Sequence, residues 1–144
     1  MRLGAVCTRD VHTTTCDRPL AEAAREMLKR NVGALPVVEL HDGLRRAVGI
    51  VTDRDIVCGQ VNRAADLHCL TVEDVMTVTP LTLPEQSGVA EAIECMSQMG
   101  VRRVLVVNDA GSLSGIVSLD DLLPIVADEL GALARLLRTH TAAH

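Results

Sequence analysis

Two short polar motifs hold the residues of this chain best suited to bind a ligand. Thr52-x-x-Asp55 and Ser118-x-x-Asp121 each place a carboxylate three residues after a hydroxyl. At a helix N-terminus such a pair lies beside free N–H groups and the positive end of the helix dipole, which attract an anion. The carboxylate can also accept two hydrogen bonds from a vicinal diol. The same spacing is that of a capping box, whose side chains only start a helix, so the motifs alone leave both interpretations open.

Both motifs belong to a pattern that occurs twice in the chain. The first copy reads GALPVV at residues 33–38 and GIVTDRD at residues 49–55; the second reads RRVLVV at residues 102–107 and GIVSLDD at residues 115–121. A duplicated unit can build one core with quasi-symmetric clefts, so functional residues are expected at paired positions.

Each copy has the pattern of a strand, a helix, two strands and a second helix. In the first copy we predict a helix that is capped by Asp17 and ended by Asn31 and Gly33. A hairpin over residues 35–39 and 47–52 follows, and then a short helix from about Arg54.

In the second copy Ser87 is the predicted cap and Gly100 ends the helix. The second hairpin spans residues 104–108 and 113–118, and a last helix runs from about Asp120 to about Arg138. Two apolar stripes on these helices have no obvious partner within the unit. They are formed by Leu122, Leu123, Val126 and Leu130, and by Ile56 and Val57.

The composition is that of a globular protein. The 144 residues are 48% hydrophobic and 23% charged, with no apolar run long enough to cross a bilayer. The first residues are too charged for a signal peptide, so we expect a cytoplasmic protein without a membrane partner. The net charge of −5 and the absence of Phe, Tyr and Trp argue against nucleic-acid binding. A planar ligand would have to lie between aliphatic side chains.

Neither metal binding nor catalysis is indicated. The five cysteines are scattered and lack a C-x-x-C pair, so reduced thiols are expected. His140 and His144 are four residues apart but lie in the tail, and His68-Cys69 has no second pair nearby. No nucleophile elbow, zinc-protease motif or Walker sequence is present, so we predict neither an enzyme nor a bound cofactor.

The repeated Gly-aliphatic-aliphatic-Thr/Ser-x-x-Asp after an LPVV-type strand resembles the cystathionine-beta-synthase-type (CBS) domain, over roughly Val6 to Ile125. The resemblance implies an α+β fold of two β-α-β-β-α repeats, packed by their sheets with pseudo-two-fold symmetry. Repeat 1 would span residues 1–61, a connector residues 62–70, repeat 2 with an extended helix residues 71–138, and a tail residues 139–144. The chain looks like a stand-alone pair, or Bateman module.

The resemblance also implies a regulatory module whose clefts hold AMP, ADP, ATP or a related adenosyl compound. In similar pairs the Asp binds ribose hydroxyls, the Thr or Ser approaches phosphate, and each cleft takes strand residues from the other repeat. One cleft would be formed by Asp55, Thr52, Arg102, Arg103 and Thr82. The other would be formed by Asp121, Ser118, Thr13, Ala34 and Leu35. The alternative for the arginines is surface ion pairing.

We also expect a two-fold homodimer that buries the two apolar stripes, because together they exceed the exposed apolar area usual for a monomer. The resemblance implies the same, and an effector protein is a possible further partner. Two other functions stay open. One is an interaction module that dimerises without binding nucleotide, and the other is a metal- or redox-responsive protein.

Overall fold

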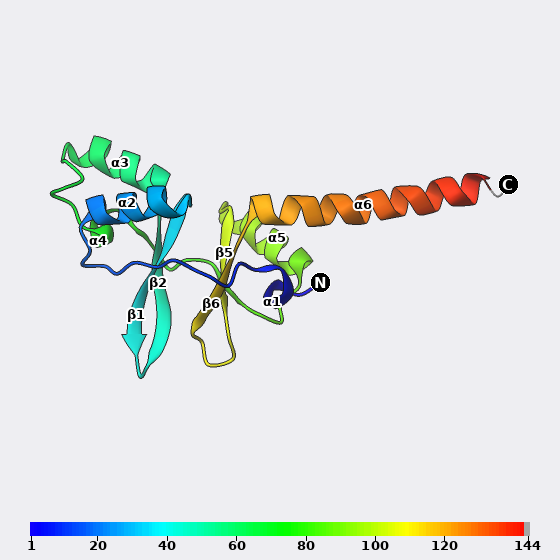
Figure 1. Ribbon diagram of the computed structural model, residues 1–144, viewed down its shortest axis with the longest axis horizontal. Coiled ribbons are helices and arrows are strands. Elements are labelled where there is room, and N and C mark those ends of the chain that lie inside the picture. The colour runs from blue at the N-terminus through cyan, green and yellow to red at the C-terminus, as the bar shows by residue number, and fades with distance from the viewer. Residues whose placement is uncertain (143–144) are drawn as a thin grey trace.

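The computed structural model describes residues 1–142 and has two lobes that lie side by side (Figure 1). The first half of the chain forms α1 (Leu3–Val6), α2 (Leu20–Arg30), β1 (Ala34–His41), β2 (Leu44–Thr52) and α3 (Asp53–Arg63). The second half forms α4 (Val72–Val75), β3 (Thr77–Val78), β4 (Thr82–Pro84), α5 (Val89–Met99), β5 (Arg103–Val107), β6 (Leu113–Ser118) and α6 (Leu119–Ala142). Each lobe contains one three-stranded sheet, of order β1-β2-β3 or β4-β5-β6, and the predicted α+β class is confirmed.

The ends of the two long repeat helices follow the prediction, but their starts do not. Asn31 and Gly100 close α2 and α5 in the left-handed conformation, with φ of 54° and 65°. The N-cap residues are Pro19 and Gly88, not Asp17 and Ser87. Asp17 lies too far upstream and instead accepts a hydrogen bond from the Thr15 hydroxyl at 2.7 Å.

Each lobe is completed by the segment that begins the other repeat. In the first lobe β3 pairs with β2, and Val72 packs with Leu20 in the core. In the second lobe Thr8 bridges to Ile116, and Leu3 is fully buried in the core. The repeats read from the sequence are therefore not the folded units, because each lobe takes one segment from each half.

An ion pair holds the exchanged N-terminal segment in place. Nη1 of Arg9 lies 2.8 Å from Oε1 of Glu85, and a second guanidinium nitrogen donates to the Gly4 carbonyl at 2.8 Å. The hydrogen bond from Arg9 holds the pKa of Glu85 below its usual value, with a smaller contribution from Ser114.

The lobes meet through their sheets. Val38 of β1 forms a buried cluster with Leu105 and Leu113 of the second sheet, flanked by Ile50 and Ile116. This shared cluster lies between the two lobe cores.

The last helix is longer than predicted and is only partly used by the core. It continues through residues 139–142 of the predicted tail, whereas His144 lies outside the described residues. Leu122 is buried in the second core, but Leu123 and Leu130 are 57% and 62% exposed. Among the described residues, no other element accompanies the helix beyond the second lobe (Figure 1). Within residues 1–142, no helix has both the length and the apolarity needed to cross a membrane.

Candidate functional site: two clefts between the lobes

The two polar motifs form capping boxes with nearly identical geometry. The Thr52 N–H donates to Oδ2 of Asp55 at 2.9 Å, and the Asp55 N–H donates to the Thr52 hydroxyl at 3.1 Å. In the second lobe the Ser118 N–H donates to Oδ2 of Asp121 at 2.9 Å, and the Asp121 N–H donates to the Ser118 hydroxyl at 3.2 Å. Among the described residues, Oδ1 of neither aspartate accepts a hydrogen bond. The capping role therefore leaves one oxygen of each carboxylate available to a ligand.

The first motif opens onto a cleft of about 210 Å³, which we call the Asp55 cleft. Arg102 and Arg103 lie at the entry to β5, and the segment before β4 adds the polar residues Thr77 and Thr79. Its lining residues are Ile50, Thr52, Asp55, Thr77, Thr79, Pro80, Leu81, Met99, Val101, Arg102, Arg103 and Leu105. This cleft combines the aspartate of one repeat with residues from the other repeat.

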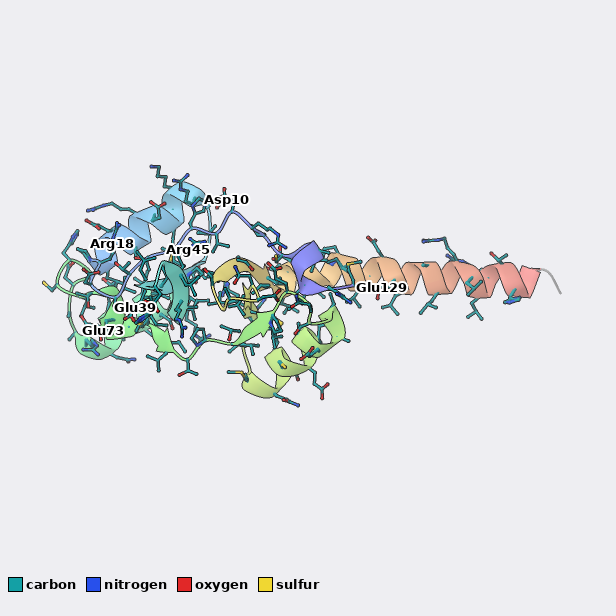
Figure 2. The ribbon with its side chains drawn as sticks, turned by 90° about the horizontal axis from the view of Figure 1, so that it is seen from below. Asp10, Arg18, Glu39, Arg45, Glu73 and Glu129 are labelled. Atoms are coloured by element: carbon teal, nitrogen blue, oxygen red, sulfur yellow. The ribbon has the colours of Figure 1, made fainter. Side chains whose placement is uncertain are left out.

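The second motif opens onto a cleft of about 320 Å³, the Asp121 cleft. It faces the start of β1 and the extended segment between α1 and α2, which carries Asp10 (Figure 2). Its lining residues are Thr8, Asp10, Val11, His12, Asn31, Val32, Gly33, Ala34, Pro36, Arg103, Ile116, Ser118, Asp120 and Asp121. Ala34, one of the candidate site residues, lies in this lining.

Three predicted cleft residues lie elsewhere. Thr82 does not line the Asp55 cleft, whose wall ends at Leu81, and Thr13 does not line the Asp121 cleft, whose wall ends at His12. Thr13 and Leu35 instead line a separate cavity beside α2. In β1 the side chains alternate, so Ala34 faces the cleft while Leu35 is fully buried behind it.

The segments that lead into these walls were not among the residues predicted from the sequence. Asp10 and His12 correspond in the repeat to Thr79 and Leu81, and all four line a cleft. The internal alignment of Thr8 with Thr77 was the available signal, since it continues through these positions without a gap. Thr79 has a φ of 53°, which is unusual for a β-branched residue and marks a constrained wall of the Asp55 cleft.

The arginines differ in their surroundings. Nη2 of Arg102 lies 3.9 Å from Oδ1 of Asp120, and both side chains are highly exposed, so this pair adds little stability. Arg103 is half-buried, lines both clefts and enters no ion pair within the described part of the chain. The alternative of surface ion pairing thus applies to Arg102 and not to Arg103.

The histidines and cysteines are dispersed over the described part of the chain. Within residues 1–142, no three His, Cys, Asp or Glu side chains come together as a metal site. All five cysteines are free, and burial is the main cause that raises the pKa of the Cys16 thiol. A raised pKa lowers the fraction of reactive thiolate.

Comparison with known proteins identifies the family. A profile of the CBS domain matches the chain twice, at residues 3–59 and 72–128, so the chain belongs to the CBS-domain family and contains a tandem pair. The CBS domain-containing protein YhcV of Bacillus subtilis is 35% identical over 115 residues, which cover 80% of this chain and 78% of YhcV. Protein MK0525 of Methanopyrus kandleri is 32% identical over 85% of this chain, which spans only 61% of MK0525. The inosine-5′-monophosphate dehydrogenase of Methanocaldococcus jannaschii is 35% identical, but the match covers 22% of that enzyme.

Solved structures share the paired architecture. The CBS domain pair of protein MJ0100, in complex with 5′-methylthioadenosine and S-adenosyl-L-methionine, aligns with a TM-score of 0.78 and 26% identity over 90% of this chain and 98% of that one. The CBS domain protein PAE2072 of Pyrobaculum aerophilum, complexed with AMP, aligns with a TM-score of 0.76 and 28% identity over 85% and 91% of the two chains.

Proposed function

We propose that this CBS pair is a regulatory module that binds an adenine nucleotide or a related adenosyl compound in the clefts between its lobes. The observation that carries the proposal is the position of Asp55 and Asp121. Each caps a helix with one oxygen and lines a cleft whose opposite wall comes from the other repeat. The ligands of MJ0100 and PAE2072 support the adenosyl class.

The walls suit the parts of such a ligand. Ile50, Leu81 and Leu105 supply aliphatic surface for a planar base, which this chain needs because it has no aromatic residue. The free carboxylate oxygen of Asp55 can accept hydrogen bonds from ribose hydroxyls, and Arg102 and Arg103 can bind a phosphate through charge-assisted hydrogen bonds. We expect a dissociation constant in the micromolar to millimolar range, or about −4 to −8 kcal/mol.

A ligand in these clefts touches both lobes and can therefore report its presence. It shifts a conformational equilibrium only if it binds two arrangements of the lobes unequally. The proposed role is regulatory, because a ligand held between the lobes can act through their arrangement. We place the module in the cytoplasm, where adenine nucleotides are abundant and free thiols such as these five stay reduced.

We further propose that the module is a homodimer joined through α6. Leu123, Val126, Leu130 and Leu133 follow the alternating three- and four-residue spacing of a coiled-coil seam. In proteins most helical stability comes from packing of an apolar face, so we expect the projecting part of α6 to have a partner, and a second copy offers the same seam. The seam spans about two heptads and would form only part of the interface. The second predicted stripe does not contribute as a whole, because Ile56 belongs to the core and only Val57 is exposed.

Calorimetric titration with AMP tests the nucleotide proposal, and the chain contains its own control. Asp74 accepts hydrogen bonds from the N–H and the hydroxyl of Thr71 at 2.8 and 3.2 Å, which repeats the capping arrangement away from either cleft. Asp55→Ala should weaken AMP binding by about 1.5–3 kcal/mol, whereas Asp74→Ala should lose only helix-cap stability of about 1 kcal/mol. Equal AMP affinity in the wild type, Asp55→Ala and Asp121→Ala would refute the assignment of these clefts.

A further inference from the structure

The two clefts share a cation. Arg103 lines both the Asp55 cleft and the Asp121 cleft. Its guanidinium reaches across to the first lobe, where Nη2 lies 3.1 Å from the point that a Cβ on Gly33 would occupy. Oδ2 of Asp53 lies 3.4 Å from the same point, so a carboxylate of the first lobe also faces this junction. One flexible side chain therefore stands where a ligand in either cleft can attract it.

The two clefts differ in the balance of charged side chains that line them. The Asp55 cleft contains Asp55 and two arginines. Among the described residues, the Asp121 cleft contains Asp10, Asp120 and Asp121, and Arg103 is its only arginine or lysine. The difference arises in the repeat itself, because Gly33 and Ala34 occupy the positions that correspond to Arg102 and Arg103. The Asp121 cleft thus has no basic residue from its own facing strand.

Arg102 also links the two clefts. Arg102 lines the Asp55 cleft but lies 3.9 Å from Asp120, which lines the Asp121 cleft. A phosphate that draws Arg102 away leaves Asp120 without this partner. A phosphate that draws Arg103 away removes the remaining arginine from the Asp121 cleft.

We infer that an anionic ligand in the Asp55 cleft sets the charge preference of the Asp121 cleft. This inference rests on the proposed function and adds a coupling between the two clefts. A phosphorylated nucleotide in the Asp55 cleft recruits both arginines and leaves three carboxylates around the other cleft. That cleft then disfavours a second phosphate, is nearly indifferent to an uncharged nucleoside and favours a cationic one. By reciprocity, a cationic nucleoside in the Asp121 cleft strengthens nucleotide binding in the Asp55 cleft.

Three adenosine compounds that differ at the 5′ position test the sign of the coupling. They are AMP, adenosine and 5′-amino-5′-deoxyadenosine, which carry a negative, no and a positive charge at that position. A ¹H–¹⁵N NMR titration of the full chain follows the clefts separately through the backbone amides of Thr52 and Ser118. In the wild type the Ser118 amide should saturate with AMP at about 10-fold higher concentration than the Thr52 amide. After AMP has filled the Asp55 cleft, the amino compound should bind the Asp121 cleft about 10-fold more tightly than a second AMP.

The variants identify the residue responsible. In Arg103→Ala, filling the Asp55 cleft with AMP should change the affinity of the Asp121 cleft much less than in the wild type. Arg25→Ala removes an exposed arginine of the first lobe that lines neither cleft, and it should leave the coupling unchanged. The coupling should also shrink in high salt.

The titrations distinguish failure of the coupling from failure of nucleotide binding. Equal AMP affinities at the Thr52 and Ser118 amides, or a coupling that survives intact in Arg103→Ala, would overturn this inference and leave nucleotide binding standing. A titration in which none of the three compounds shifts either amide would overturn the proposed function together with the coupling.

Discussion

The projecting helix gives the sharpest prediction about assembly. Leu130 lies at the centre of the α6 seam and is 62% exposed in the single chain. Full burial of a leucine contributes about 1.5–3 kcal/mol, so burial of this exposed fraction contributes about 1–2 kcal/mol per chain. A two-fold interface contains the residue twice. Leu130→Glu should therefore weaken the dimer by roughly 2–4 kcal/mol, or about 30- to 900-fold in dissociation constant. The desolvation of two carboxylates adds to this loss.

Sedimentation equilibrium across a micromolar concentration range measures the effect directly. Wild-type protein should sediment as a dimer and Leu130→Glu as a folded monomer with an unchanged far-ultraviolet circular dichroism spectrum. Leu28 is 84% exposed on α2, away from α6, so Leu28→Glu is the matched control and should remain dimeric. Leu122 is 1% exposed, and Leu122→Glu should unfold the second lobe.

Two results would refute this reasoning. One is a wild-type protein that stays monomeric at micromolar concentration with and without AMP. The other is a Leu130→Glu protein that dimerises as tightly as the wild type, which would move the interface away from the seam.

Figure 2 shows Glu129 on the same part of α6, and a charge is already tolerated there beside the seam.

Three further predictions concern stability. Arg9 lowers the pKa of Glu85, so this contact stabilises the fold above the pKa of the unfolded state and is lost as pH falls through the folded pKa. Glu85→Gln should be less stable than the wild type at pH 7, and chemical denaturation should show the difference shrinking below about pH 4. Gly49→Ala or Gly115→Ala should each lower the free energy of unfolding by about 1–3 kcal/mol. The reason is that the new Cβ would lie 2.8 Å from Met76 Sδ or 2.5 Å from Cys7 Sγ. Melting temperatures equal to that of the wild type would contradict this. Gly131→Ala lies within α6, where a Cβ meets only Arg135 at 3.4 Å, and should stabilise the protein by up to about 1 kcal/mol in a thermal melt.

Local sequence patterns predicted local structure well. The hairpin predicted over residues 35–39 and 47–52 forms between β1 and β2, and its Asp42-Gly43 turn has φ values of 52° and 78°, which suit a two-residue loop. Asn31 and Gly100 end their helices because each tolerates the left-handed conformation. These features depend on a few adjacent residues, and such residues are sufficient to predict them.

The exchange of segments between the lobes could not be predicted in this way. Nothing within Leu3–Val6 indicates whether the segment packs on its own repeat or on the other one. The close approach at Gly115 depends on the same tertiary choice, since the atom beside it belongs to Cys7.

The residues expected in the cleft walls differ by one position from those that line the clefts. Thr13 and Thr82 were expected to line the clefts, but the walls end at His12 and Leu81. Successive residues of an extended segment face opposite sides, so a shift of one residue moves a side chain from the cleft to the other face. The family resemblance implied ligand contact for these threonines, whereas the register of the neighbouring strands decides which side chain reaches the cleft.

The duplicated scaffold separates what maintains the fold from what distinguishes the clefts. Glycines at 49 and 115 stand at equivalent places and leave room for the exchanged segments, and the two capping boxes superpose in their hydrogen bonds. The walls, by contrast, diverge in charge, because Arg103 corresponds to Ala34. A small residue at position 33 also gives the guanidinium of Arg103 its space between the lobes. The symmetry therefore provides two similar clefts, and the asymmetry of a few side chains can give them different ligands and make each sensitive to the other.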